Sequence, residues 1–353
     1  MPTSTPYTGP IFDVQAHAIT PSSYPPIATA IRTNPHLEQA TASTIADDIC
    51  VQLADDLQGA ARRQALGETG IQVITINAFF PPSLPADILL RILTDTNSWM
   101  ATQTAASPQL IGIASMPPAP VLAAAGLAPD NEPYTQKALA HLRHALTTLN
   151  LRGLMFASNY NGIFLGDPSY DPYFALVADL NVPVIIHPAV EPVETPHIAR
   201  KNIPTYSGFL NDQRTALLDL VLSGVYEKYP NLIIIATHLG GGILTSLGRF
   251  RELAKRFPAD AFYVDREGEK RLLPLSVPEY LKKVYFDCNN ADEVDIRHAA
   301  EVVGYGHLLT GTDFPWTDDR FTREVLGEVE EGVRADLAWN NAAGLFGVEG
   351  LVG

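Results

Sequence analysis

Short apolar runs alternate with longer amphipathic segments along the whole chain. The runs are rich in Val, Ile and Leu, and continuous apolar runs are typical of parallel strands buried on both faces. We expect strands at residues 11–18, 71–78, 110–116, 151–157, 182–187, 232–238, 284–288 and 307–312. We expect helices between strands at residues 86–104, 134–149, 214–229, 243–257 and 292–303. The pattern therefore predicts an α/β fold.

Eight strands, each followed by helical sequence, predict one (β/α)8 TIM barrel that spans residues 1–353 as a single domain. The chain is about 100 residues longer than a typical barrel. The surplus fits insertions after strand one, at residues 21–67, and after strand five, at residues 189–208. An open, doubly wound sheet is the competing fold, but no G-x-G-x-x-G motif follows an early strand.

Composition narrows the class of protein. Hydrophobic residues make up 46% of the chain and charged residues only 18%, against ~25% in an average globular protein. This balance predicts a large buried core and argues against disorder. The formal charge of −15 would repel a phosphate backbone, so we expect no nucleic-acid partner. No apolar run reaches the length of a membrane span, so we expect no membrane partner.

Cysteine usage and the amino-terminal residues bear on the compartment. The two cysteines, Cys50 and Cys288, are too few for a disulfide framework. The first ten residues have neither a basic start nor an apolar core, so we expect no signal peptide. The cytoplasm, which is reducing, is therefore the expected location.

Polar side chains close several of the predicted strands. His17, His187, His238 and Asp313 end strands one, five, six and eight, and Gln15 lies two residues before His17. Catalytic groups of a barrel sit at the carboxyl ends of its strands, so we expect these side chains to converge at one mouth. Imidazoles and a carboxylate are the usual ligands of a catalytic divalent ion. The sequence therefore predicts a mononuclear metal site, against the alternative that each histidine is a hydrogen-bonded core residue.

Other conspicuous residues are interpreted without a catalytic role. Cys288, at the end of strand seven, is expected to be a small buried hydrophobe rather than a ligand or nucleophile. The glycine run at residues 240–242 is expected to allow a tight turn rather than to bind an anion. Five other histidines are expected at the surface, namely His36, His141, His144, His197 and His298.

A set of short motifs follows a fixed order between residues 12 and 348. The first three are Gln-x-His at 15–17, the segment from Gly153 through Asp167, and Pro-Val-Ile-Ile-His-Pro at 183–188. The next two are Leu-Ser-Gly-Val-Tyr-Glu-Lys-Tyr-Pro at 222–230 and His-Leu-Gly-Gly at 238–241. The last two are Gly-Thr-Asp-Phe-Pro at 311–315 and Asn-Ala-Ala-Gly-Leu-Phe-Gly at 341–347. In this order, and with these positions at strand ends, the chain resembles the amidohydrolase superfamily. It resembles in particular the branch that contains aminocarboxymuconate-semialdehyde decarboxylase and the methylsalicylate-type decarboxylases.

The resemblance implies roles for the strand-end residues. His17, His187 and Asp313 would bind the metal, and His238 would be a catalytic group that contacts a metal-bound water or the substrate. The chain departs from the family at Gln15, where the family has the first histidine of His-x-His and some decarboxylases have Glu. An amide oxygen is a poorer ligand for zinc than imidazole or carboxylate. We therefore expect a divalent metal, zinc in the first place, held by three strong ligands and Gln15, and no organic cofactor.

The resemblance favours a lyase that decarboxylates a small unsaturated or aromatic carboxylic acid without oxidation. The metal would act as a Lewis acid, and Asp313 or His238 would deliver the proton that replaces CO2. A metal-dependent hydrolase of a lactone, amide or imine is one alternative. The other is a metal-free enzyme of specialised metabolism, or a small-molecule binder, that uses the same histidines and Asp313 as acid/base groups. Gln15 is the feature that supports this last alternative.

The substrate pocket is expected at the same mouth. Phe79 and Phe80 end strand two, Asn159 follows strand four and Trp316 follows strand eight. Because pockets are lined mainly by aromatic and apolar groups with a few polar ones, we expect these four residues to bind substrate.

The segment after strand six carries an unusual share of arginines for an acidic protein. In the resembled decarboxylase, an arginine of this segment binds the substrate carboxylate across a dimer interface. Arg249 is the candidate here, with Arg251 and Arg256 as alternatives. The resemblance therefore implies a homodimer, which is also the commonest closed assembly.

Overall fold

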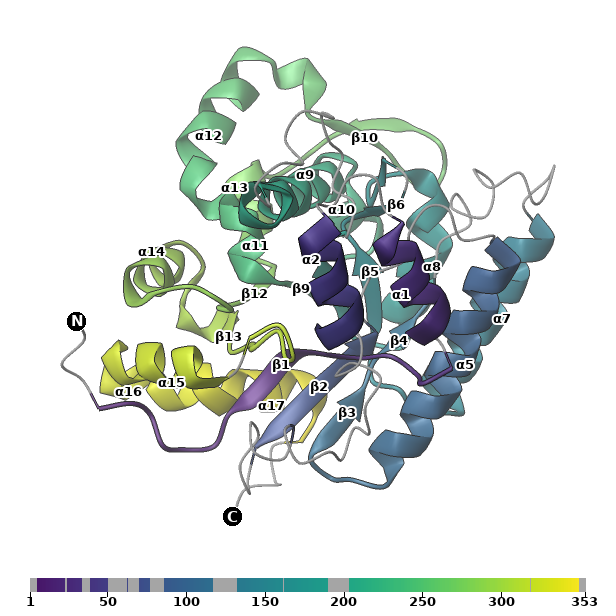
Figure 1. Cartoon of the computed structure of the whole chain (residues 1–353). Coiled ribbons are helices and arrows are strands. Elements are labelled where there is room, and N and C mark those ends of the chain that lie inside the picture. Colours follow the sequence, from purple (N-terminus) through teal and green to yellow (C-terminus); the bar gives the residue numbers. More distant parts are fainter. Residues whose placement is uncertain are drawn as a thin grey trace.

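The computed structural model describes residues 5–22, 24–33, 39–49, 62, 70–76, 86–116, 132–160, 162–189, 203–317 and 319–348. Within these residues, parallel strands occupy the eight positions of a barrel, which confirms the predicted TIM-barrel fold (Figure 1). In chain order they are β1 (Phe12–Ala18), β2 (Ile71–Ile76), β3 (Leu110–Gly112) with its continuation β4 (Ala114–Ser115), β5 (Leu154–Ala157), β8 (Val184–His187), β9 (Ile234–Ala236), β12 (Tyr285–Asp287) and β13 (Leu308–Leu309).

The strands form a ring that is joined at two places. At the first, β3 pairs with β2 while β4 pairs with β5, so that one strand position belongs to both sheets. At the second, a parallel bridge joins Asp13 of β1 to Thr310, next to β13. The Asp313 N–H also donates to the Gln15 carbonyl over 2.7 Å. The carboxyl ends of the strands therefore face one mouth.

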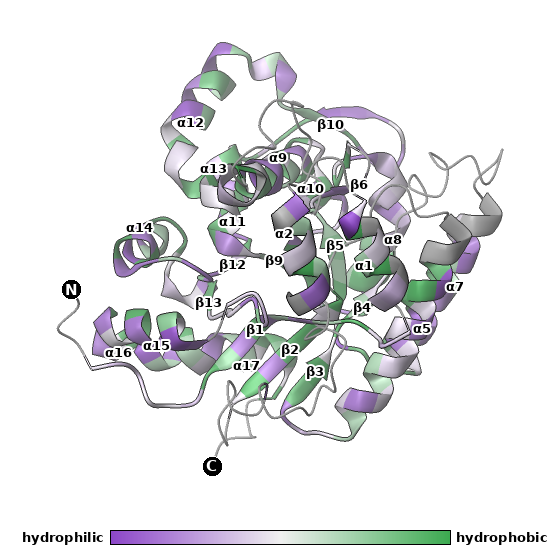
Figure 2. Cartoon of the chain, in the orientation of Figure 1, coloured by the Kyte–Doolittle hydropathy of each residue, from purple (hydrophilic) through white to green (hydrophobic). Residues whose placement is uncertain are grey.

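Alternate residues of each strand pack on opposite sides of the barrel wall. Phe156 of β5 packs edge-on against Tyr170 on the helical side, with ring centroids 5.4 Å apart. Its neighbour Met155 belongs to a second buried cluster together with Ile185 and Ile235 of the adjacent strands. The central strands carry much of the hydrophobic colour in Figure 2, whereas hydrophilic positions mark the outer helices α12 and α15. Burial on both sides explains why the strands read as continuous apolar runs.

Helices surround the strands. The longer ones are α5 (Ala86–Ala105), α7 (Glu132–Thr147), α8 (Asp171–Asp179), α9 (Phe209–Leu222), α12 (Leu247–Arg256), α14 (Glu293–Val303) and α15 (Asp319–Glu328). The shorter ones are α10 (Val225–Lys228), α11 (His238–Gly242), α13 (Val277–Leu281), α16 (Glu331–Ala335) and α17 (Asn341–Phe346). None of the described helices combines the length and the hydropathy that crossing a bilayer requires.

The insertion after strand one and two hairpins complete the described structure. The insertion contains α1 (Tyr24–Arg32), α2 (Gln39–Thr44) and a π-helical turn (Ile45–Ile49). The hairpins are β6 (Asn159–Tyr160) with β7 (Ile163–Phe164), and β10 (Phe262–Val264) with β11 (Lys270–Leu272). Most of the second predicted insertion lies outside the described residues, and its end forms a π-helical turn (Pro204–Gly208).

Two predicted helices differ from the observed ones. The helix expected at 214–229 begins earlier, at Phe209, and breaks at Gly224, which adopts the left-handed φ of 67°. A Cβ at Gly224 would lie 2.3 Å from the Tyr263 ring, so only glycine fits this break. The helix expected at 243–257 divides into a 3-10 turn (Ile243–Ser246) and α12. Both boundaries depend on packing between distant segments, which the local pattern does not contain.

Candidate functional site

Five polar side chains from four strand ends meet at the mouth of the barrel. Gln15 and His17 lie at the end of β1, and His187 is the last residue of β8. His238 opens α11 directly after β9, and Asp313 follows β13. Parallel strands that end at one rim place these residues together although they are up to 298 positions apart in the chain.

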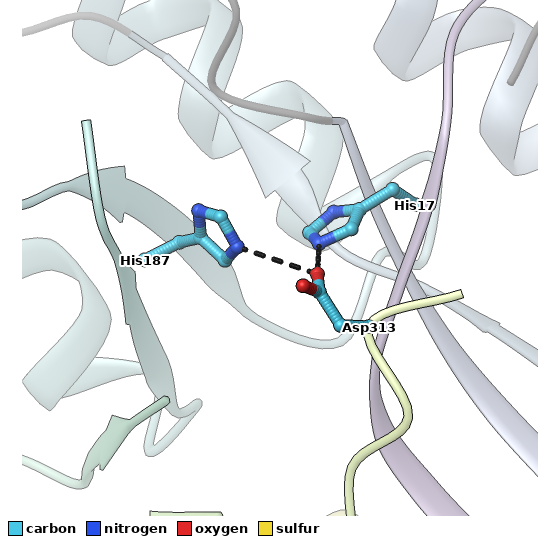
Figure 3. A group of neighbouring side chains, drawn as sticks. All are labelled: His17, His187 and Asp313. Carbon is cyan, nitrogen blue, oxygen red and sulfur yellow. Dashed lines mark hydrogen bonds and ion pairs between the residues drawn. The ribbon is translucent and has the colours of Figure 1, made fainter. Parts of the chain in front are cut away.

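His17, His187 and Asp313 form the centre of the site (Figure 3). The Oδ1 atom of Asp313 lies 2.8 Å from Nε2 of His17 and 3.6 Å from Nε2 of His187. One potential ligand atom from each residue lies within 4.8 Å of the others. Two ligand atoms about 2 Å from a common metal ion lie at most about 4 Å apart, a limit that the 2.8 and 3.6 Å separations satisfy. The three side chains therefore fit the donor set of one divalent ion.

The hydrogen bonds made by Nδ1 of His17 and His187 determine which ring nitrogen faces the centre. His187 Nδ1 lies 3.0 Å from the Pro188 carbonyl, which can only accept, so Nδ1 carries the proton. The neutral ring then presents its Nε2 lone pair to the site, and this buried atom has no hydrogen-bond partner among the described residues. His17 Nδ1 contacts the Thr75 hydroxyl at 2.8 Å, and this hydroxyl donates to the Ala16 carbonyl. Thr75 therefore accepts from His17, whose Nε2 lone pair also faces the centre.

Two nitrogen lone pairs and a carboxylate oxygen thus face one point. Acceptor atoms at 2.8 Å repel each other unless a proton or a metal cation lies between them. Burial lowers the pKa of His17, which disfavours the proton. The donor set is therefore better matched by a cation than by the side chains alone.

Gln15 completes one side of the centre. Its Nε2 lies 3.0 Å from Asp313 Oδ1 and 3.1 Å from His238 Nε2. Its Oε1 is buried and has no hydrogen-bond partner among the described residues. The two ends of an amide have nearly the same shape, so rotation about the last side-chain bond would direct this oxygen to the centre. Gln15 can thus serve either as a neutral ligand or as a hydrogen-bond donor to Asp313.

Charge at the centre is set by burial and by the histidines. Burial alone would raise the pKa of Asp313, but the proximity of His17 and His187 to its carboxylate outweighs burial and holds the pKa well below its usual range. Burial lowers the pKa of His238 to about 4, in spite of the nearby Asp313 carboxylate. At neutral pH the site therefore contains a carboxylate and an uncharged His238 imidazole.

The side chain of Asp287, at the end of β12, binds the backbone N–H of His238. The Asp287 Oδ1 accepts hydrogen bonds from the N–H groups of His238 and Asn289, over 2.9 and 3.0 Å. His238 has a φ of 50°, in the left-handed region that residues with a side chain rarely adopt. Burial raises the pKa of Asp287 to about 8. Asp287 therefore stabilises an unusual backbone conformation that directs His238 to the site.

A second buried network supports β1. Asp13 accepts from the Thr312 hydroxyl over 2.6 Å and from the Gln72 amide over 2.8 Å. Arg62, from the insertion, donates to the Gln72 side chain and to the His17 carbonyl, over 2.6 and 2.8 Å. These contacts fix the backbone that carries His17 and connect the insertion to the site.

A cavity of about 860 Å³ opens next to the centre. His187, His238, Asp313 and Trp316 lie on its surface, with further walls from α9, α11 and α14. The other lining residues are Ile45, Pro188, Thr205, Tyr206, Phe209, Leu210, Arg214, Leu239, Gly241, Gly242, Leu244, Thr245, Asn289, Asn290, Ala291, Asp295, His298, Ala299 and Thr317. The reactive groups thus border a space large enough for a small organic substrate.

The predicted substrate-binding residues do not all lie at this cavity. Trp316 lines it, whereas Asn159 is buried outside the lining and donates its amide to Asp212 over 2.9 Å. Arg249 is exposed on α12 and is also outside the lining. Phe79 and Phe80 lie outside the described residues. The position of Asn159 after a strand predicted a place in the pocket wall. Its amide binds Asp212 instead, a tertiary contact that position along the chain does not reveal.

The structure adds residues that the sequence analysis did not select. Arg214, Phe209 and Tyr206 come from the turn before α9 and its first turns. Asp287 was not among the residues selected from the sequence, although it ends a strand as His187 does. Applying the strand-end rule to strand seven would have found Asp287, whereas no local signal marks the α9 residues.

The comparison with protein families is consistent with this geometry. A model of the amidohydrolase family matches residues 84–348. The chain belongs to the amidohydrolase family. The resemblance inferred from the strand-end motifs is thereby confirmed at the level of the family.

Curated relatives of this amidohydrolase include decarboxylases. The chain is 26% identical over 219 residues to 2-amino-3-carboxymuconate-6-semialdehyde decarboxylase of Dictyostelium discoideum, covering 61% of this chain and 58% of that protein. It is 26% identical over 226 residues to a 6-methylsalicylic acid decarboxylase of Aspergillus aculeatus, covering 60% of this chain and 65% of that protein. The matches thus span less than two thirds of the length of these relatives.

Solved structures support the fold of the amidohydrolase. The 5-carboxyvanillate decarboxylase of Novosphingobium aromaticivorans, with bound manganese and a nitrobenzoic acid, superposes with a TM-score of 0.78 and 19% identity. The match covers 97% of this chain and all of that one. The 5-carboxyvanillate decarboxylase of Sphingomonas paucimobilis gives a TM-score of 0.76 at 18% identity, covering 96% and 99% of the two chains. At these identities the likeness shows the fold alone.

Proposed function

We propose that this amidohydrolase is a metal-dependent, non-oxidative decarboxylase of a small aromatic carboxylic acid. The observation that carries the proposal is the convergence of two histidine lone pairs on the Asp313 carboxylate at the edge of a cavity. The curated relatives named as decarboxylases of aromatic or unsaturated acids support the reaction class. The manganese bound by related structures supports a divalent ion.

We assign separate roles in metal binding and proton transfer to the residues of the site. His17, His187 and Asp313 would hold the ion, with Gln15 as a weaker fourth ligand. The bound ion would supply Lewis-acid polarisation of substrate oxygens. In the reaction the bond between the ring and the carboxylate breaks, CO2 leaves, and the electron pair stays on the ring carbon. Because Asp313 is a carboxylate and His238 is uncharged at neutral pH, one of them would first take up a proton from the substrate hydroxyl or from water. It would then deliver this proton to the ring carbon at the cavity to form the new C–H bond.

The proposal also covers the identity of the metal ion, the oligomeric state of the protein and its location. Zinc is expected from the histidine-rich donor set, and manganese is the competing ion because related structures contain it. We also propose a homodimer in which Arg249, exposed on α12 of the single chain, binds the substrate carboxylate across the dimer interface, and a location in the cytoplasm. Elemental analysis and light scattering measure the first two directly.

Metal content measured beside CO2 release tests the proposal. We expect purified protein to contain about one divalent ion per chain, in line with mononuclear sites of this type, and to release CO2 from 2-hydroxy-6-methylbenzoate or 2,6-dihydroxybenzoate. Chelation should abolish the release, and added zinc or manganese should restore it. Hydrolysis of a lactone or amide without CO2 release would indicate the hydrolase alternative.

A metal-free acid/base enzyme is the second candidate, and the geometry of Gln15 favours it. The Gln15 amide bridges Asp313 and His238, which makes a hydrogen-bonded set that needs no ion. In that case a proton would lie between His17 and Asp313 in place of the ion. Activity that survives chelation in protein without stoichiometric metal would establish this candidate and contradict the first.

A further inference from the structure

One seam of the barrel carries two of the three proposed metal ligands. The seam consists of β1 and residues 310–314, the segment that follows β13. Figure 3 shows His17 on the first and Asp313 on the second. An isolated parallel bridge joins Ala16 to Phe314, and the His17 N–H donates to the Phe314 carbonyl over 2.8 Å. The separation of the two ligands therefore depends on contacts across this seam.

Arg62, from the insertion after strand one, contacts both sides of the seam. Its Nη2 donates to the His17 carbonyl over 2.8 Å. Its guanidinium carbon lies 4.8 Å from the centre of the Phe314 ring, within the range of a cation–π contact. The residue is only 4% exposed. One buried side chain thus binds one metal ligand through its backbone and packs on the residue that follows the other.

A second branch from the same guanidinium reaches the seam through side chains. Nη1 donates to Gln72 Oε1 over 2.6 Å, and Gln72 Nε2 donates to Asp13 over 2.8 Å. Asp13 also accepts from the N–H and the hydroxyl of Thr312, over 2.9 and 2.6 Å. The network therefore connects Arg62 to the residue that precedes Asp313.

The charge and the geometry of Arg62 should affect metal binding in opposite directions. A cation near a divalent ion opposes its binding by Coulomb repulsion. Groups that fix the ligands in place favour binding, typically by about 10–100-fold. The donors that reach the seam bind a backbone carbonyl and a neutral amide, so they fix positions without occupying the lone pairs that face the ion. The geometric effect should therefore be the larger one.

We propose that Arg62 is a positioning residue of the metal centre, which holds the seam so that His17 and Asp313 keep the separation that one divalent ion requires. This proposal rests on the metal-dependent function proposed above. It gives the insertion a role in metal binding as well as in the cavity, whose wall includes Ile45 of the same insertion. Metal affinity then depends on the planar fork of Arg62 more than on its charge.

Two substitutions at Arg62 separate geometry from charge. Arg62→Met keeps an unbranched side chain but removes the donors and the charge, and it should weaken zinc or manganese binding by about 10–100-fold. Arg62→Lys keeps the charge but has one ammonium group in place of the fork, so it should also bind the ion more weakly than wild type. Competition with a chromogenic chelator measures these affinities. Tighter binding in Arg62→Met would show that charge repulsion dominates and would overturn the proposal.

Another arginine of the insertion provides the control. Arg32, on α1, is exposed and pairs with Asp47 of the same insertion. Arg32→Met should therefore leave the metal affinity unchanged. An equal loss of affinity in Arg32→Met and Arg62→Met would show that any disturbance of the insertion weakens the site, which would overturn the specific role of Arg62.

The visible spectrum of cobalt-loaded protein reports the ligand geometry without a measurement of activity. Arg62→Met should change the cobalt bands, whereas Arg32→Met should keep the wild-type spectrum. A merely structural Arg62 would lower the free energy of unfolding but leave the affinity and the spectrum of the folded protein unchanged, and this result would overturn the proposal. If Arg62→Met does not fold, its combination with Gln72→Met takes its place, because replacing both partners of a buried hydrogen bond costs less than leaving one unpaired.

The outcomes separate this proposal from the function on which it rests. If wild type binds no divalent ion, both the metal-dependent function and the role of Arg62 fail. If wild type binds an ion and Arg62→Met binds it equally well, only the role of Arg62 fails. If Arg62→Met binds the ion more weakly but no aromatic acid releases CO2 with wild type, the decarboxylase function fails while the positioning role stands.

Discussion

At the scale of single residues, the site depends on which atom each side chain presents. The Pro188 carbonyl fixes the tautomer of His187, and Thr75 orients His17, so both Nε2 lone pairs face Asp313. Partners of this kind typically change metal affinity by about 10–100-fold when they are lost. Gln15 is the residue at which this chain differs from the histidine of the family pattern, and it is therefore the natural position to vary.

Metal affinity should respond in opposite directions to two substitutions. His187→Ala removes one of three strong ligands and should weaken metal binding by more than ~100-fold, beyond the loss of an outer partner. Gln15→His supplies an imidazole in place of an amide and should tighten binding by about 10-fold or more. Competition with a chromogenic chelator measures both constants.

His298 provides the matched control for the substitutions at His187 and Gln15. His298 lines the same cavity but lies outside the ligand set, so His298→Ala should leave the affinity unchanged. Equal affinities in wild type and His187→Ala would contradict the assignment of ligands.

At the scale of elements, the turn between β9 and the 3-10 turn after it connects the site to the cavity. Leu239, Gly240, Gly241 and Gly242 all have left-handed φ values, between 48° and 73°. This run directs its carbonyls to Arg214 and lets α9 approach closely. The glycine run is thus a tight turn, as expected, and one whose conformation places both His238 and part of the cavity wall.

Gly241→Ala should destabilise the protein. A Cβ at Gly241 would lie 2.0 Å from the Leu210 carbonyl oxygen, and its φ of 64° is unfavourable for any side chain. We expect a loss of at least ~2 kcal/mol in the free energy of unfolding, measured by urea denaturation. Gly248→Ala is the control, since no atom lies within 4 Å of that Cβ and the residue is in α12. This control should gain about 0.5–1 kcal/mol from helix propensity, and equal losses in both variants would contradict the argument.

At the scale of the whole molecule, the barrel buries several ionisable groups whose effects on stability have opposite signs. Burial raises the pKa of Asp13 to about 6 and that of Asp287 to about 8, from 3.8. Between the unfolded and folded values the folded state retains a proton that the unfolded state has released, so stability falls as pH rises. The depressed pKa values of His17 and His238 act in the other direction, and the stability they add is lost as pH falls below 6.5.

Metal-free protein should therefore lose stability between about pH 7 and pH 9. Above pH 7 the unfolded histidines and Asp13 have lost most of their protons, so the change in this window reports mainly on Asp287. We expect a fall of roughly 1 kcal/mol in the free energy of unfolding across this window, measured by urea denaturation at a series of pH values.

Replacing each carboxylate by an amide assigns the effect. Asp287→Asn keeps an oxygen that can accept from the His238 and Asn289 N–H groups, but it cannot ionise, so the dependence on pH should flatten. Asp13→Asn should leave the slope above pH 7 unchanged, because a group with a pKa of about 6 has lost nearly all of its proton by that pH. An unchanged slope in Asp287→Asn would show that another group titrates.

The sequence by itself determined the order of strands and helices and the five strand-end residues of the site. Both are local properties, because burial on two faces produces continuous apolar runs and a parallel barrel brings all strand ends to one rim. Only the tertiary structure decided which partners these residues have. Asp287 holds His238, Arg62 holds the His17 carbonyl, and α9 supplies a cavity wall that no strand-end motif marks. These contacts join segments that are tens of positions apart, and their geometry follows from the closure of the barrel and the packing of helices around it, which no local pattern encodes.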